Sequence, residues 1–257
     1  MTNWSALDQE LAAWDGAGRT FDLWWRDDDA VATGPKLERL RTMAAQFDLP
    51  LHLAIIPADL TQSLINDVMQ EVNLVPFVHG WQHRNHEPAD RKKCEFGPAR
   101  SLGAQQADIK AGLARLQDAF GSKLCPIFVP PWNRMDKELY PTLSALGFKA
   151  VSQFQPRLER FAAPGLRQIN THIDPIAWKA GGGLAEPQWL VDHTTQVLKD
   201  RRLGTTDNDE PLGLLTHHIV HDSAVWAFCI ELLSHLRQGP MRPWRADAHF
   251  GDLNEPT

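Results

Sequence analysis

Seven short apolar runs alternate along the chain with longer segments whose apolar residues recur every three or four positions. Short runs of this kind predict buried strands, and the longer recurrence predicts helices. The predicted strands lie at residues 20–26, 49–57, 73–79, 124–131, 148–154, 166–174 and 211–220. The predicted helices lie at residues 34–47, 61–72, 103–120, 136–147, 187–203 and 222–239. This alternation favours parallel strands in a barrel or a doubly wound sheet.

The length of the chain suits one large α/β domain better than two small ones, because 257 residues can bury a sizeable core. Residues 1–18 read as a polar amphipathic helix and lack the layout of a secretory signal. Residues 240–257 look like an irregular tail. We therefore expect a single domain over residues 1–257.

Charge and motifs exclude several classes of function. The chain carries 26 Lys and Arg against 32 Asp and Glu, which argues against a nucleic-acid partner. It has no apolar run near the roughly 18 residues of a membrane span, and no glycine-rich nucleotide motif. Three widely spaced cysteines, Cys94, Cys125 and Cys229, predict reduced and mostly buried thiols. The expectation is a soluble cytoplasmic protein.

Polar side chains gather where the predicted strands end, which is where α/β proteins place their functional groups. The first strand is followed by Asp27, Asp28 and Asp29. Three adjacent carboxylates repel one another unless solvent or a cation relieves the repulsion. A solvated loop with a helix cap explains an isolated triplet. The position directly after a buried strand favours a metal-binding or catalytic carboxylate more than an isolated triplet would.

The third strand ends in His79, and His83 follows four residues later. Residues at this spacing share one face of a helical turn, so both imidazoles can reach one ion. Gly80 stands where a zincin motif has its glutamate, and it lets the chain turn off the strand. A chance pair of loop histidines is the alternative. An Asp with two His would leave open positions on a zinc-like ion, as in catalytic sites.

Two further strand ends carry candidate groups. Pro130 and Pro131 stiffen the loop after the fourth strand and present Trp132. His217 emerges at the end of the last strand, where an imidazole can act as a general acid or base. Taken singly, a plain turn and a buried structural histidine explain these residues. Because four strand ends carry such groups together, a functional site is the better interpretation.

At these residues the chain resembles the polysaccharide deacetylase family, the NodB-homology carbohydrate esterases. The family has, in order, an Asp-Asp pair, H-[ST]-x-x-H, a motif such as R-P-P-Y, an Asp/Trp motif and a late L-x-H. The matching stretches, from Arg26 to about Asp222, are "RDDDA", "HGWQH", "FVPPWN", "HIDPIAW" and "LLTHH". The resemblance implies a distorted (β/α)7 TIM-like barrel and a metal-dependent hydrolase that removes acetyl groups from an N- or O-acetylated sugar, oligosaccharide or polysaccharide.

By the same resemblance, Asp28, His79 and His83 would bind one divalent ion, zinc in the first place, with cobalt, nickel or manganese as alternatives. Asp27 would be the catalytic base. The register within the triplet is open, so the Asp-Asp pair could instead be Asp28 and Asp29.

The remaining roles implied by the resemblance fall on the later motifs. His217 would be the catalytic acid, with His218 as the alternative. Trp132, Pro131 and Trp178 would contact the substrate, and the Trp132 backbone N–H would steady the oxyanion together with the metal. An acetylated carbohydrate would be the partner.

The chain departs from the family pattern at three positions. Val129 stands where the third motif has its arginine, Gly80 replaces the usual Ser or Thr, and Arg84 replaces the usual Pro. Two alternative functions follow: an amidase on a small non-sugar amide, and a non-catalytic metal-dependent carbohydrate-binding protein. Val129 favours the non-catalytic alternative, whereas the presence of Asp27 and His217 opposes it.

Overall fold

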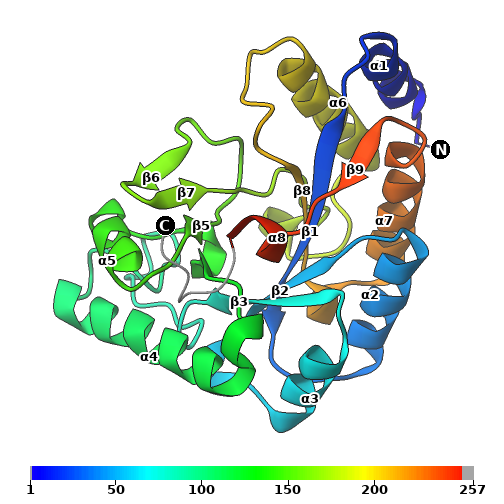
Figure 1. Ribbon diagram of the computed structural model, residues 1–257. Helices are drawn as coiled ribbons and strands as arrows, with labels where there is room; N and C mark the ends of the chain where they lie inside the picture. Colours follow the sequence, from blue (N-terminus) through cyan, green and yellow to red (C-terminus); the bar gives the residue numbers. More distant parts are fainter. Residues whose placement is uncertain (1, 251–257) are drawn as a thin grey trace. The chain divides into compact units, whose positions relative to one another are not determined.

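The computed structural model describes residues 2–250, and these divide into two compact units. The first unit contains residues 2–27, 34–51 and 171–244, and the second contains residues 28–33, 52–170 and 245–250. Residues 21–27 of strand β1 (Phe21–Ala30; Figure 1) belong to the first unit and residues 28–30 to the second, so the acidic triplet is divided between the units. The predicted single domain stays a prediction.

The strands of the first unit form a small parallel group. The part of β1 up to Asp27 pairs with β8 (Leu212–Thr216), and its beginning pairs with β9 (Met241–Pro243). The register with β8 runs from Leu23 opposite Leu212 to Asp27 opposite Thr216. The helices of this unit are α1 (Ser5–Gly16), α2 (Pro35–Gln46), α6 (Pro187–Arg202) and α7 (Ser223–Leu236).

Local sequence signals explain where these helices begin. Pro35 occupies the first turn of α2, where a missing N–H costs nothing. The Glu186 side chain accepts hydrogen bonds from two backbone N–H groups at the start of α6. The Asp222 side chain accepts one from the Val225 N–H at the start of α7. Such caps satisfy donors that a helix leaves unpaired at its first turn.

The second unit is built on a longer run of strands. Their spatial order is β2 (Leu51–Ile55), β3 (Leu74–His79), β4 (Ile127–Val129), β5 (Ala150–Val151), β7 (Leu166–Gln168) and β6 (Phe161–Ala163). The pairs β3–β4, β4–β5 and β5–β7 are parallel, and only the hairpin of β6 with β7 is antiparallel among the pairs from β3 onward. Its helices are α3 (Gln62–Gln70), α4 (Leu102–Phe120), α5 (Tyr140–Ala145) and α8 (Asp247–Phe250).

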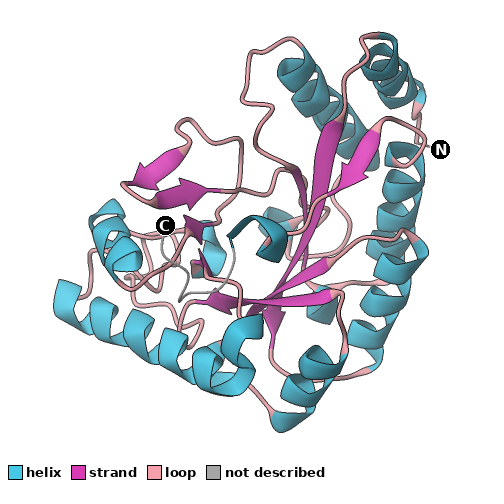
Figure 2. Ribbon diagram, in the orientation of Figure 1, coloured by secondary structure: helices cyan, strands magenta, loops and turns pink. Residues whose placement is uncertain are grey.

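A long loop separates β3 from α4, and it contains neither a helix nor a strand (Figure 2). It begins with Gly80 and ends at Ser101, whose hydroxyl caps α4 by accepting from the Ala104 N–H. The sequence predicts this loop, and loops after buried strands are where α/β proteins carry their functional residues.

The seven predicted strands are all present, and two details differ from the sequence-based expectations. Strand β1 extends to Ala30, so the acidic triplet lies within a strand and not in a solvated loop. The expectation of an irregular tail is wrong for residues 241–250, which contain β9 and α8. Trp244 anchors this segment: it is buried, and its ring meets Trp24 edge-on at 5.7 Å. Residues 251–257 of the predicted tail lie outside the described residues.

Other expectations agree with the structure. Residues 5–16 form the predicted first helix. The three cysteines are free and buried. No described helix combines the length and apolar character that crossing a membrane requires.

Candidate metal centre

Three side chains of the second unit converge on one point. Asp29 lies near the end of β1, His79 is the last residue of β3, and His83 lies in the loop that follows. Asp29 Oδ1 is 3.1 Å from His79 Nε2 and 3.2 Å from His83 Nε2. Within residues 2–250, these residues form the one group of three or more His, Cys, Asp or Glu whose ligand atoms all lie within 4.8 Å of one another. The predicted histidine pair therefore meets a carboxylate.

The donor set fits a divalent ion. His79 Nδ1 donates to the Val129 carbonyl oxygen at 2.9 Å, which leaves Nε2 facing Asp29. A lone pair on Nε2 would then meet a carboxylate lone pair at 3.1 Å unless a proton or a cation lies between them. Two ligands of a tetrahedral zinc ion lie about 3.3 Å apart, close to both separations. One carboxylate and two imidazoles suit Zn²⁺ or Co²⁺.

Burial and charge act differently on the two imidazoles. Burial disfavours protonation of His79, but the hydrogen bond with Asp29 and the charges of Asp28 and Asp29 outweigh it and raise the pKa of His79. Burial and the charge of His79 lower the pKa of His83. When His79 is protonated in the metal-free protein, the proton on Nε2 therefore lies between His79 and Asp29, at the place where a metal ion would bind.

The backbone around these residues adopts left-handed conformations, which L residues rarely take. Asp29 has a φ of 69°, His83 of 53° and Trp132 of 55°, and Gly80 opens the turn between the histidines with a φ of 59°. Each such non-glycine residue costs about 1–2 kcal/mol, and strain of this kind collects at functional sites. The predicted helical turn is accordingly wrong: the rings lie 5.1 Å apart across an irregular turn.

Asp28, the ligand named first from the sequence, is not in this converging group. It is buried, at 2% exposed, and its charge acts on both His79 and His83. Of the two registers predicted for the triplet, these contacts favour the one in which Asp29 is the ligand. The role of each carboxylate stays a prediction.

The loop after β4 brings Pro131 and Trp132 to the histidines. The Trp132 ring lies 4.3 Å from the His83 ring, at 50° to it. Pro131 is buried against Gly80: a Cβ added to Gly80 would come within 2.6 Å of the proline ring. The stiff loop predicted from the sequence therefore packs directly on the turn that carries His83.

Asp27 lies in the first unit, in a network of its own. Its carboxylate accepts from the Thr216 hydroxyl at 2.6 Å and from the His218 backbone N–H at 3.0 Å, and it pairs with His218 Nδ1 at 2.5 Å. Burial opposes ionisation of Asp27, but the charge and ring N–H of His218 and the Thr216 hydroxyl outweigh it and lower the pKa of Asp27. Asp27 and His218 thus form a buried ion pair at the end of β8.

His217, the predicted acid, also lies in the first unit. Its ring meets the Trp178 ring edge-on at 4.8 Å, and its backbone N–H donates to His221 Nε2 at 3.2 Å. Trp178 is exposed and donates its indole N–H to Asp174 Oδ2 at 2.8 Å. Burial lowers the pKa of His221 to about 4, so this imidazole is a neutral acceptor near pH 7. His217 and Trp178, which the sequence assigned to separate roles, are therefore in contact.

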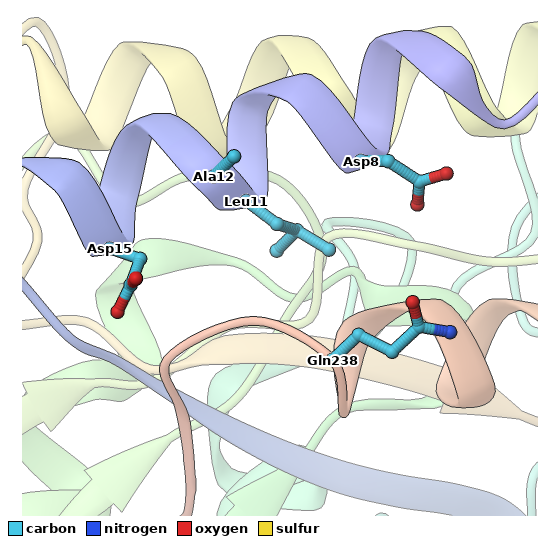
Figure 3. Close-up of a pocket in the computed structure, with 5 residues that line it drawn as sticks. All are labelled: Asp8, Leu11, Ala12, Asp15 and Gln238. Carbon is cyan, nitrogen blue, oxygen red and sulfur yellow. The ribbon is translucent and has the colours of Figure 1, made fainter.

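A separate hollow of about 250 Å³ lies in the first unit beside α1 (Figure 3). Its lining consists of Asp8, Leu11, Ala12, Asp15 and Gln238. None of the predicted site residues lines it, and Asp8 is already paired with His235 at 2.6 Å. We assign no function to this hollow.

Sequence reasoning missed two groups that act on the histidines. The Val129 carbonyl orients His79, and the Glu95 carboxylate accepts N–H groups from the turn before His83. The carbonyl leaves no sequence signal, because any residue supplies one. Glu95 lies in the loop "KKCEFG", where nothing distinguishes it from a solvated glutamate.

No family model matches the chain, and neither does any curated protein. Solved structures do match it. One is a family 4 carbohydrate esterase from Streptomyces lividans in complex with acetate, with a TM-score of 0.55 and 13% identity over 90% of this chain and 96% of that one. A peptidoglycan N-acetylglucosamine deacetylase has a TM-score of 0.54 and 13% identity over 93% and 96%. A CE4 family pseudoenzyme from Bacillus anthracis has a TM-score of 0.52 and 14% identity over 86% and 63%.

These likenesses, at such low identity, show the fold. The predicted fold class, an α/β chain of the distorted (β/α)7 barrel type, is confirmed. The similarity runs over most of this chain, and the proteins that share this fold include a carbohydrate esterase, a deacetylase and a pseudoenzyme. Whether such a scaffold catalyses depends on the side chains at the site.

The convergence of the three ligands predicts which substitutions abolish metal binding. Asp29→Asn and His79→Ala should each weaken Co²⁺ or Zn²⁺ binding by roughly tenfold or more, because each removes a direct ligand. Asp27→Asn should leave the affinity near that of the unmodified protein. Calorimetric titration of the purified variants measures this. If Asp28→Asn weakens binding while Asp29→Asn does not, the ligand is Asp28.

The proton held between His79 and Asp29 predicts how metal affinity depends on pH. The metal has to displace that proton, so binding should release it to the buffer. Because the pKa of His79 is raised, the apparent affinity should fall by about tenfold per pH unit once the pH drops below that pKa. Titrations in two buffers of different ionisation enthalpy count the proton released. Heats that do not depend on the buffer would contradict this assignment.

Proposed function

We propose that this chain is a metal-dependent hydrolase that removes acetyl groups from an acetylated carbohydrate. The observation that carries the proposal is the convergence of Asp29, His79 and His83 on one point, in a fold shared with solved carbohydrate deacetylases. Ligand sets with one carboxylate and two imidazoles leave positions on an ion for water and substrate. A cytoplasmic location remains the prediction from sequence.

Asp29, His79 and His83 would hold the ion, and zinc, cobalt, nickel and manganese are the candidates. The ion, when bound, polarises an acetyl carbonyl and lowers the pKa of a bound water. The chain's own residues prepare this position. Val129 keeps the His79 proton on Nδ1, so that Nε2 is the ligand atom, and Trp132 packs on the ring of His83.

For the base we propose Asp28, one residue after Asp27, which the resemblance to the family had indicated. Asp27 is held by Thr216 and by His218, whose charge also stabilises it. Asp28 is buried next to the ligand Asp29, and its charge acts on both histidines. A carboxylate in that place can take the proton of the attacking water.

The proton for the leaving group would come from His217. In amide hydrolysis the water oxygen forms a bond to the acetyl carbon, the C–N bond breaks, and the amine leaves with a proton that His217 donates. The Trp178 ring against His217 limits how its imidazole can turn. The exposed indole of Trp178, with its N–H fixed on Asp174, offers an apolar face to a sugar ring.

The loss of the family arginine at Val129 favours a second candidate, a metal-dependent carbohydrate-binding protein without catalysis. The Val129 side chain is fully buried and cannot tether a carboxylate. Among the solved structures of this fold is a pseudoenzyme. Turnover decides between the two candidates, because both require the metal.

Acetate release from a panel of N- and O-acetylated sugar oligomers tests the proposal. Protein loaded with Co²⁺ or Zn²⁺ should release acetate, and the metal-free protein should not. Asp28→Asn should retain the metal and lose turnover by about 10²-fold or more, the usual effect of removing a positioned base. Asp27→Asn is the matched control and should retain most of the turnover. Metal binding without any acetate release would establish the non-catalytic candidate.

His217 and its neighbour His218 provide a second matched pair. His217→Ala should lower kcat on an amide by about 10²–10⁴-fold, with the metal retained. The loss should shrink on an aryl acetate, whose leaving group needs little protonation. His218→Ala should affect both substrates alike, because it removes the partner of Asp27 and not a proton donor. Equal, small effects of both variants would remove His217 from the mechanism.

A further inference from the structure

We propose that Glu95 is a positioning residue for the metal site: its buried carboxylate holds the turn that places His83. This inference rests on the proposed function and names a residue that neither the motifs nor the ligand set contains. Glu95 lies in the loop between β3 and α4, and its side chain is fully buried within the second unit.

The Glu95 carboxylate accepts hydrogen bonds from backbone N–H groups of the turn that carries His83. Its Oε1 atom accepts from the Gln82 N–H at 2.8 Å and, at the limit of a hydrogen bond, from the Arg84 N–H at 3.5 Å. Its Oε2 atom accepts from the Trp81 N–H at 3.1 Å. These three N–H groups surround His83 in sequence. Successive N–H groups that point to one side of a turn form a concave anion site, and here the anion belongs to the chain itself.

The turn needs such an anchor because its own conformation is costly. Gly80 at one end and His83 at the other are both left-handed, and this conformation is unfavourable for the non-glycine residue, His83. Hydrogen bonds to an ionised carboxylate are roughly twice as strong as those between neutral groups. If the carboxylate were lost, the partly buried N–H groups of this turn would lose their acceptor. The turn would then relax toward other conformations.

Gly80 is the residue that allows the carboxylate to lie so close. A Cβ at this position would come within 2.3 Å of Glu95 Oε2. The Gly80 carbonyl is confined as well, since a Cβ added to Gly112 of α4 would lie 2.7 Å from it. The departure from the family's Ser or Thr at Gly80 and the buried Glu95 are therefore two parts of one arrangement.

The two histidines depend on Glu95 to different degrees. His79 ends a strand, and its ring is held by the Val129 carbonyl. His83 lies in the turn, where its ring contacts Trp132 and its backbone is flanked by the N–H groups that Glu95 binds. Loss of Glu95 should therefore displace His83 and leave His79 in place.

The test measures Co²⁺ binding to the Glu95→Gln protein. Calorimetry gives the affinity, and the visible absorption of the bound ion reports its ligands. Glutamine keeps the size of the side chain but turns an NH₂ group toward N–H donors. Affinity should fall by about 10–100-fold, the usual effect of losing a residue that orients a ligand. His83→Ala should weaken binding much less in the Glu95→Gln protein than in the unmodified one, because both changes remove the same ligand. The absorption spectrum of the bound Co²⁺ should change with it.

Glu87 offers a matched control in the same loop. It is a buried glutamate whose Oε1 accepts from the Ala99 N–H at 3.0 Å, away from the His83 turn. Glu87→Gln should leave Co²⁺ affinity and spectrum unchanged, and thermal unfolding of the metal-free variants shows that both are folded. Equal losses for Glu87→Gln and Glu95→Gln, or unweakened binding by Glu95→Gln, would overturn the inference. Absence of Co²⁺ binding by the unmodified protein would instead overturn the proposed function.

Discussion

One carboxylate oxygen, Asp29 Oδ1, lies within 3.2 Å of two imidazole nitrogens, and the rest of the site is arranged around this contact. Because the other nitrogen of His79 already donates to a carbonyl, the contact is unfavourable unless a proton or a metal ion lies between the two groups. Despite burial, the hydrogen bond with Asp29 and the charges of Asp28 and Asp29 raise the pKa of His79, which favours a proton in this position when no metal is bound. A metal ion bound at this point would satisfy Asp29, His79 and His83 at the same time.

The three adjacent carboxylates of β1 avoid mutual repulsion because they face different partners. Asp27 pairs with His218 and Thr216, and Asp29 with the histidines, while Asp28 lies buried between them in sequence. The left-handed backbone at Asp29 breaks the strand's alternation at this residue. Neighbouring residues of one type can therefore hold a structural ion pair, a candidate base and a metal ligand.

The orientation of His79 explains how the chain tolerates Val129 in place of an arginine. Parallel pairing of β3 with β4 sets His79 opposite Val129, and the hydrogen bond uses the main-chain carbonyl. Every residue offers that carbonyl, so the substitution leaves the orientation of this ligand intact. A valine side chain cannot bind a carboxylate, and this is why metal binding and turnover have to be measured separately.

The sequence by itself determined the alternation of strands and helices, the ends of the strands as the place of the site, and the pairing of His79 with His83. These features rest on apolar periodicity and spacing, which are local properties of a chain. Only the tertiary structure decided that Asp29 is the carboxylate that reaches the histidines, and that Glu95 lies under their turn. The reason is that the left-handed backbone at Asp29 and the burial of Glu95 against the turn of its own loop depend on contacts in the folded chain, and spacing along the sequence does not record them.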